Sequence, residues 1–217
     1  EVFNNIVSTF KNTFYLILCS ISGFLLFGLF LGIVNGYYKY YNFSKIFTLI
    51  QKAIESVPLL LWVLVTVVTV NFVISANYHQ YEWPIIYFLF GVFSSTALSK
   101  LVTEKIDSLR DKDFIVALKL LGLTDYTIIF NHIIRYYCFD IILFQLINII
   151  AQSIYLNITL CIIEFHQNDT IGMMFNHAFA NRYSTESFID LIIISTLIYF
   201  VMSSLFYTAR YLKSKNA

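Results

Sequence analysis

The side chains most able to do chemistry in this chain form no catalytic or metal-binding pattern. The four histidines are spread over separate segments: His79, His132, His166 and His177. No glycine precedes a lysine, so the P-loop that cradles nucleotide phosphates is absent, and no GxSxG, HExxH or CxxC motif occurs. The segment 164–182 holds two of the histidines, but their spacing matches no metal template. We therefore expect no catalytic residue, no metal site and no nucleotide cofactor in this chain.

A row of amides is the clearest polar feature within an apolar stretch. Gln145, Asn148 and Gln152 are three and four residues apart, so they share one face of a helix. Amides in hydrocarbon must face protein or water. The row therefore has two interpretations, the lining of a translocation path or hydrogen-bonded bridges between helices.

Small residues recur with helical spacing near the N-terminus. Gly28, Gly32 and Gly36 repeat every fourth residue and form a ridge that lets another helix approach closely. The ridge predicts a packed helix interface rather than a catalytic site. Its partner is either a helix of the same chain or a second subunit.

The elements that position these residues are membrane-spanning helices, as the composition indicates. Of the 217 residues, 59% are hydrophobic and only 12% are charged, whereas soluble domains are about a quarter charged. Too little polar surface remains to cover a water-soluble globule of this composition. A net charge of +1 without a basic stripe also argues against nucleic acid as a partner.

Five apolar stretches are long enough to cross a bilayer, which takes about 20 helical residues. They make a single transmembrane domain over residues 1–217, with spans near 12–36, 46–74, 84–103, 133–163 and 187–212. Pro58 lies inside the second stretch and should kink or break it. Because backbone polar groups must be satisfied within lipid, the fold class is all-α.

The positive charges predict the orientation of these spans. If the loop 104–131 is cytoplasmic, all 14 lysines and arginines except Lys11 and Arg182 lie on or near the inside. The N-terminus of this sequence is then outside and its C-terminus inside. This order is expected if one helix precedes the sequence.

The loop 104–131 is the sizeable polar segment between spans, and it contains a short helix. Asp113 is a suitable N-cap and Gly122 a suitable residue just beyond the C-terminus. Thr124 or Asp125 would then cap the next helix. From periodicity alone, this short helix could also lie on lipid headgroups.

The residues from Leu109 to Ile134 resemble the "EAA" loop of ABC importer permeases, in the oligopeptide/dipeptide/nickel branch. Ala117 falls on the first alanine of that motif, Gly122 on its glycine, and Asp125 and His132 on the D and the IIFxHI element. Val116 replaces the acidic residue of the triplet. Weaker matches flank the loop in the order of the family, at residues 31–38, 56–61 and 170–174.

The resemblance implies the five-span core of a type I importer permease, in the bacterial cytoplasmic membrane, with a cytoplasmic coupling helix. This helix would enter a groove of an ATPase, with Asp113 at its start, Phe114, Leu118 and Leu121 as apolar knobs, and Ala117 allowing close approach. The partners implied are a second permease forming a heterodimer, two cytoplasmic ATPases that hold ATP-Mg, and an extracytoplasmic binding protein. Short peptides or nickel and metal-chelate complexes would be the cargo. The alternatives are a non-transporting scaffold, a channel subunit, or a membrane-embedded enzyme.

Overall fold

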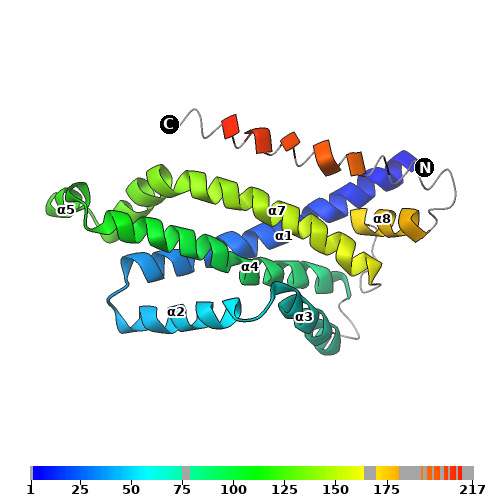
Figure 1. The fold of residues 1–217 in the computed structure, drawn as a ribbon, viewed down its shortest axis with the longest axis horizontal. Coiled ribbons are helices and arrows are strands. Elements are labelled where there is room, and N and C mark those ends of the chain that lie inside the picture. The colour runs from blue at the N-terminus through cyan, green and yellow to red at the C-terminus, as the bar shows by residue number, and fades with distance from the viewer. Residues whose placement is uncertain are drawn as a thin grey trace. The chain divides into compact units, whose positions relative to one another are not determined.

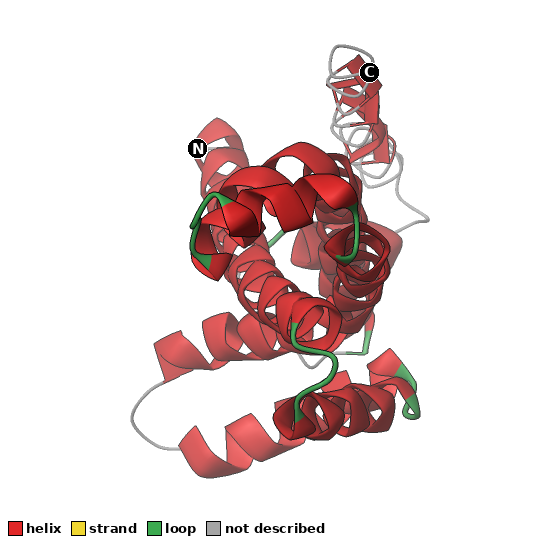
Figure 2. Cartoon of the chain, turned by 90° about the vertical axis from the view of Figure 1, so that its left-hand side faces the viewer, coloured by secondary structure: helices red, strands yellow, loops and turns green. Residues whose placement is uncertain are grey.

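The computed structural model describes residues 2–74, 79–163 and 170–180, together with scattered residues between 192 and 211. Over these residues the chain is helical and contains no strand (Figure 2). Its elements are α1 (Val2–Tyr37), α2 (Asn42–Glu55), α3 (Leu59–Ile74), α4 (His79–Arg110), α5 (Asp113–Leu120), α6 (Asp125–Thr127), the π-helix η1 (Ile128–Cys138), α7 (Phe139–Ile162) and α8 (Ile171–Ala180) (Figure 1). The expected all-α class is confirmed.

Three of the described helical segments are long and apolar enough to cross a membrane. They are Val7–Tyr37, Glu82–Arg110 and Asp125–Ile162, and a bent pair of α2 and α3 makes a fourth if it counts as one span. These positions match four of the five predicted stretches. The fifth, 187–212, lies largely outside the described residues, although those described within it are helical. The fold is thus compatible with a multi-pass membrane protein and has three or four candidate spans among the described residues.

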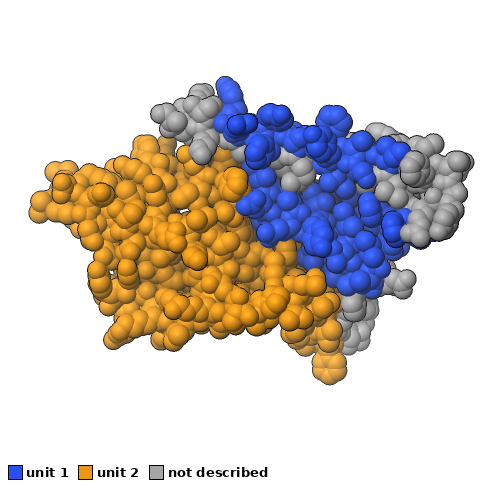
Figure 3. Space-filling view, in the orientation of Figure 1, with its two compact units in different colours: residues 1–19, 147–217 blue, residues 20–146 orange. Residues whose placement is uncertain are grey.

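The chain groups into two compact units (Figure 3). One is Ser20–Leu146, and the other combines Glu1–Cys19 with Ile147–Ala217. Every contact that bears on the loop after α4 lies in the first of these units. The expectation of one transmembrane domain stays a prediction.

Pro58 separates α2 from α3, as the sequence predicts. The two helices meet at an angle of 92° (Figure 1). Because proline cannot continue the ladder of helical hydrogen bonds, the break needs other contacts to hold it. Trp62 supplies them: its indole N–H donates to the carbonyl of Ile54 at 3.0 Å, and its ring stacks on Phe93 with centroids 4.7 Å apart.

Helix α2 buries its polar side chains and exposes its apolar ones, which is the reverse of a helix on the surface of a soluble protein. Its buried residues are polar, Ser44 and Gln51. Its exposed face carries large apolar side chains, among them Ile46 and Leu49, which are 59% and 66% exposed. A helix with this arrangement is stable where the surroundings are lipid, because exposed apolar patches of this kind are costly in water. The pattern independently supports a membrane environment for the unit.

The glycine ridge of α1 packs against α4 within the same unit. A Cβ added at Gly28, Gly32 or Gly36 would come within 3 Å of a side chain of α4, belonging respectively to Leu98, Val102 and Ile106. The three contacts advance by four residues on each helix, so the two ridges run along each other. Of the two interpretations left open by the sequence, the structure supports packing within the chain.

In the second unit, polar side chains hold the start of α8. The hydroxyl of Thr13 accepts a hydrogen bond from the backbone N–H of Ile171 at 3.0 Å. The amide oxygen of Asn157 accepts one from the N–H of Gly172 at 2.7 Å. Because the first N–H groups of a helix have no partner within it, these contacts satisfy donors that would otherwise be buried without one. Asn157, an isolated polar residue in the sequence, thus has a structural role.

Candidate functional site

The predicted coupling loop is more helical than expected. Residues 104–110 are the last turns of α4, and residues 125–131 already belong to α6 and η1. Helix α4 continues through this charged stretch because one of its faces remains buried, at Ile106 and Leu109. The non-helical positions are reduced to 111–112 and 121–124. Helix α5 is therefore held between two short connections, not within a long flexible loop.

The two ends of α5 follow common helix-capping rules, with one correction at the start. Lys112 occupies the N-cap position and Asp113 is the first helical residue, so Asp113 is not the N-cap. Its carboxylate nevertheless lies in the first turn, where negative charge interacts favourably with the helix dipole. Thr124 is the N-cap of α6, as one of the two predicted alternatives, and accepts from the N–H of Thr127.

Gly122 ends α5 in a Schellman motif. Its φ of +79° lies in the left-handed region, which glycine adopts without steric cost. The N–H of Gly122 donates to the carbonyl of Lys119 at 3.0 Å, and the N–H of Leu123 donates to that of Leu118 at 3.3 Å. These bonds reverse the chain sharply. The predicted position of Gly122, just beyond the C-terminus of the short helix, is confirmed.

Tyr37, at the end of α1, fixes the loop to the helical unit. Its hydroxyl donates to the carboxylate of Asp125, and the ammonium of Lys119 lies 5.1 Å from the centre of its ring. On the other side of α5, the ring of Phe114 packs against Tyr137 of η1 with centroids 5.7 Å apart. Ile115 is fully buried. Helix α5 is thereby attached to α1 and η1 through both of its flanks.

The outward face of α5 is apolar. Val116, Ala117, Leu120 and Leu121, hereafter the apolar patch, are all exposed, and the two leucines are 84% and 79% exposed. Of the three predicted knobs, Leu121 belongs to the apolar patch, while Phe114 and Leu118 are half-buried. A patch of this kind on a polar connection between spans is a feature of interaction surfaces.

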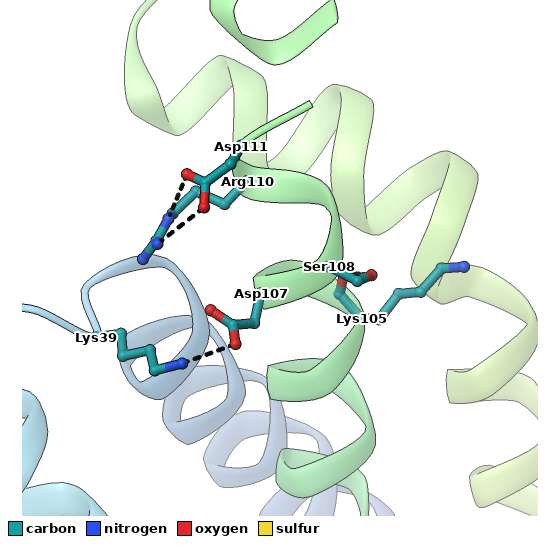
Figure 4. A network of polar contacts seen from close by, with 6 residues as sticks. All are labelled: Lys39, Lys105, Asp107, Ser108, Arg110 and Asp111. Atoms are coloured by element: carbon teal, nitrogen blue, oxygen red, sulfur yellow. Dashed lines mark hydrogen bonds and ion pairs between the residues drawn. The ribbon is translucent and has the colours of Figure 1, made fainter. Parts of the chain in front are cut away.

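Charged side chains join the ends of α1 and α4 beside the loop (Figure 4). The ammonium of Lys39 donates to Asp107 at 2.8 Å, and Arg110 contacts the carboxylate of Asp111 through two nitrogens, at 3.2 and 3.3 Å. The hydrogen bond to Asp107 raises the pKa of Lys39, and the one from Arg110 lowers the pKa of Asp111. Both pairs therefore stay ionised at neutral pH. The Lys39–Asp107 pair is exposed and therefore contributes little to stability, whereas the Arg110 side chain is only 10% exposed.

A separate, buried network of amides and hydroxyls connects α1, α2 and α4. The side-chain oxygen of Gln51 accepts from the amide of Asn35 at 3.0 Å and from the hydroxyl of Ser99 at 3.2 Å. Its nitrogen donates to Glu55 at 3.1 Å. Thr48 also donates to the oxygen of Asn35, at 3.3 Å. Gln51 is thus the centre of the contact among the three helices.

No family model matches this chain, and no curated protein does either. The residues themselves must therefore carry any functional argument.

The remaining predicted site residues lie on η1 and α7. His132 is half-buried in η1. Gln145 and Asn148 are half-buried on α7, and Gln152 is exposed. Their assignment to a translocation path stays a prediction. No group of three or more histidine, cysteine or acidic residues among the described positions could hold a metal ion, and His166 lies outside those positions.

Sequence reasoning missed the importance of Tyr37 and Gln51. In the sequence, Tyr37 is one residue of the flanking match at 31–38, and Gln51 belongs to no motif. The sequence carries a signal for Gln51. Gln51, Ser44 and Glu55 are spaced for one face of a helix whose other face is apolar, which in a membrane protein predicts a polar face directed inward.

Proposed function

We propose that this chain is the permease subunit of an ATP-driven importer of the oligopeptide/dipeptide/nickel type, and that α5 is the coupling helix. The observation that supports this function best is the exposed apolar patch on α5. This helix lies between two candidate spans and is held on both of its flanks. An apolar surface on a cytoplasmic connection is explained if another protein covers it. The resemblance of residues 109–134 to the EAA loop implies that this protein is an ATPase.

The attachment of α5 suits the transmission of a mechanical displacement. A helix on a flexible loop would move without displacing the spans, whereas α5 is held by Tyr37 from α1 and by Tyr137 from η1. A movement imposed on the apolar patch is then passed to α1 and to the start of the segment that leads into α7. Rigid-body displacement of helices is a common form of switching in proteins.

The proposed assembly contains a second permease as heterodimer partner, two ATPases that bind ATP-Mg, and an extracytoplasmic binding protein, in a bacterial cytoplasmic membrane with the C-terminus inside. The chain itself performs no covalent chemistry. Short peptides and nickel or metal-chelate complexes are the cargo classes that the resemblance implies. Selectivity would rest mainly with the binding protein.

The experiment is co-purification of the tagged chain from its native cells, followed by measurement of ATP hydrolysis and uptake. We expect an ATPase subunit at stoichiometric ratio. Ala117→Glu places a charge in the apolar patch without a clash, because Ala117 is exposed. It should abolish uptake and weaken the ATPase contact while leaving membrane insertion intact. Gly122→Pro should uncouple ATP hydrolysis from uptake.

A matched control is Ser108→Glu, which adds the same charge at an exposed position of α4 that lies outside the apolar patch. It should leave both uptake and ATPase recovery unchanged. Normal uptake by Ala117→Glu would refute the role of α5. A chain that purifies without any ATPase would favour the alternative of a scaffold or channel subunit.

A further inference from the structure

A cleft lined by charged and polar side chains lies beside α2, apart from the apolar patch. Its volume is about 630 Å³. It is open on one side and is lined by the end of α1, by α2 and by the last turns of α4. The charged residues on its walls are Lys39, Lys45, Lys52, Glu55, Lys100, Glu104 and Asp107. A volume of this size is typical of sites that bind small molecules.

Part of this charge has no ion-pair partner among the described residues. Lys39 and Asp107 neutralise each other at 2.8 Å. No other ion pair is formed by the lining residues within the part of the chain that the structure describes. Lys100 and Glu104 lie in the last three turns of α4, at the charged end of the candidate span Glu82–Arg110, and both are exposed. At the edge of the hydrocarbon, unpaired charged groups are compensated by water or by lipid headgroups, so these side chains are available to a charged ligand.

The position along α4 places the cleft near one surface of the bilayer. Lys100 and Asp107 are seven residues apart, which is about 10 Å of helix. At the end with Asp107, the turn from α1 to α2 exposes Tyr40 and Tyr41, which are 79% and 59% exposed. Tyrosines are concentrated at the level of lipid headgroups. The charged walls, about 10 Å long, are therefore expected at the headgroup level.

The cleft is bordered on its α2 side by a surface suited to acyl chains. Leu49 lines the cleft and is also 66% exposed on the outer face of α2. Ile46 and Ile50 continue this apolar face and are 59% and 45% exposed. A ligand in the cleft thus meets charge at one end and an outward apolar helix face beside it. This combination fits an amphiphile better than a hydrophilic peptide.

The remaining charges select the headgroup. Once Lys39 and Asp107 are paired, three lysines and two glutamates line the walls. Lysines bind phosphate oxygens and carboxylates bind ammonium groups by charge-assisted hydrogen bonds. We propose that this cleft binds the phosphoethanolamine headgroup of a phospholipid, with its phosphate at Lys52 and Lys100 and its ammonium at Glu104.

The test is native mass spectrometry of the full chain, purified in detergent and exposed to phosphatidylethanolamine, phosphatidylcholine or phosphatidylglycerol at equal concentration. Phosphatidylcholine has the same phosphate but a quaternary ammonium without N–H donors. We expect preferential retention of phosphatidylethanolamine. Removing one charge-assisted hydrogen bond with Lys52→Gln or Lys100→Gln should weaken retention about tenfold.

Glu104→Gln serves to test the ammonium contact. It should remove the preference for phosphatidylethanolamine over phosphatidylcholine while the phosphate contacts keep both lipids bound. Lys11→Gln is the matched control, because Lys11 is exposed and belongs to the other compact unit. Its lipid retention should equal that of the unmodified chain.

Three results would overturn the proposal: equal retention of the three lipids, no effect of the lysine substitutions, or displacement of the lipid by short peptides. The last would identify the cleft as part of a cargo path. Lipid retention is measured without any ATPase. A failure of the lipid proposal would therefore leave the proposed transport function untouched. Conversely, loss of ATPase co-purification would not affect this result.

Discussion

Gly122 offers the sharpest test of how α5 is held. Its φ of +79° is unfavourable for any residue with a Cβ, whereas the space around it is empty, with no atom within 4 Å of an added Cβ. The cost of Gly122→Ala is therefore conformational rather than steric, about 1 kcal/mol. Gly122→Asn should cost less, because asparagine tolerates the left-handed region.

Gly122→Pro should have a larger effect for two reasons. Proline fixes φ near −65°, and it removes the N–H that donates to Lys119 at 3.0 Å. The neighbouring bond from Leu123 to Leu118 depends on the same turn. We expect the last turn of α5 to open in this variant, while the insertion of the long helices in the membrane is retained.

Amide hydrogen exchange measures these differences directly. In a peptide covering residues 117–124, Gly122→Ala should exchange about fivefold faster, which corresponds to about 1 kcal/mol. Gly122→Asn should lie between this variant and the unmodified chain, and Gly122→Pro should show no protection. Val116→Ala, an exposed change within α5, is the control and should exchange at the original rate. Unchanged exchange in Gly122→Ala would refute the requirement for a left-handed residue.

Other consequences of the structure can be checked by thermal unfolding of the purified protein and by chemical labelling. Gly32→Val should destabilise the chain by about 1–3 kcal/mol, because the added atoms overlap Val102, and normal stability would contradict the close helix contact. Gln51→Leu should cost about 1–3 kcal/mol by leaving buried partners unsatisfied, with an unchanged melting temperature as the contrary result. Asn157→Leu should destabilise by a similar amount through loss of its bond to the start of α8. A cysteine introduced by Leu120→Cys should react with a membrane-impermeant reagent only from the cytoplasmic side, and labelling from outside would reverse the proposed topology.

Local features were predictable from the sequence, because their causes lie within a few residues. Pro58 interrupts the helical hydrogen bonds of the second apolar stretch, and Gly122 ends the apolar-periodic segment that precedes it. The apolar stretches likewise determine where spans can lie. The structure confirms the break at Pro58 and the helix end at Gly122, and it has helices long and apolar enough to span a membrane at four of the five predicted stretches, counting the bent pair of α2 and α3 as one span.

Features that depend on packing were not predictable. The charged residues 104–110 read as loop, yet they are helical because Ile106 and Leu109 are buried against the rest of the unit. Likewise, periodicity could not show that Phe114 packs on Tyr137 while Leu120 is exposed, since either side of α5 is apolar. The pairing of Asn35 with Gln51 joins residues from different helices, which no local pattern reveals.

The interlocking of α1 and α4 limits how this unit can change shape. Because the glycines of one helix receive the side chains of the other at three successive turns, neither can slide along its neighbour without first separating. In a rearrangement of the unit, these two helices would then move together as one rigid body. The hinge of the unit is then the bend at Pro58, which the indole of Trp62 spans. Helices α2 and α3 could rotate relative to each other about this hinge.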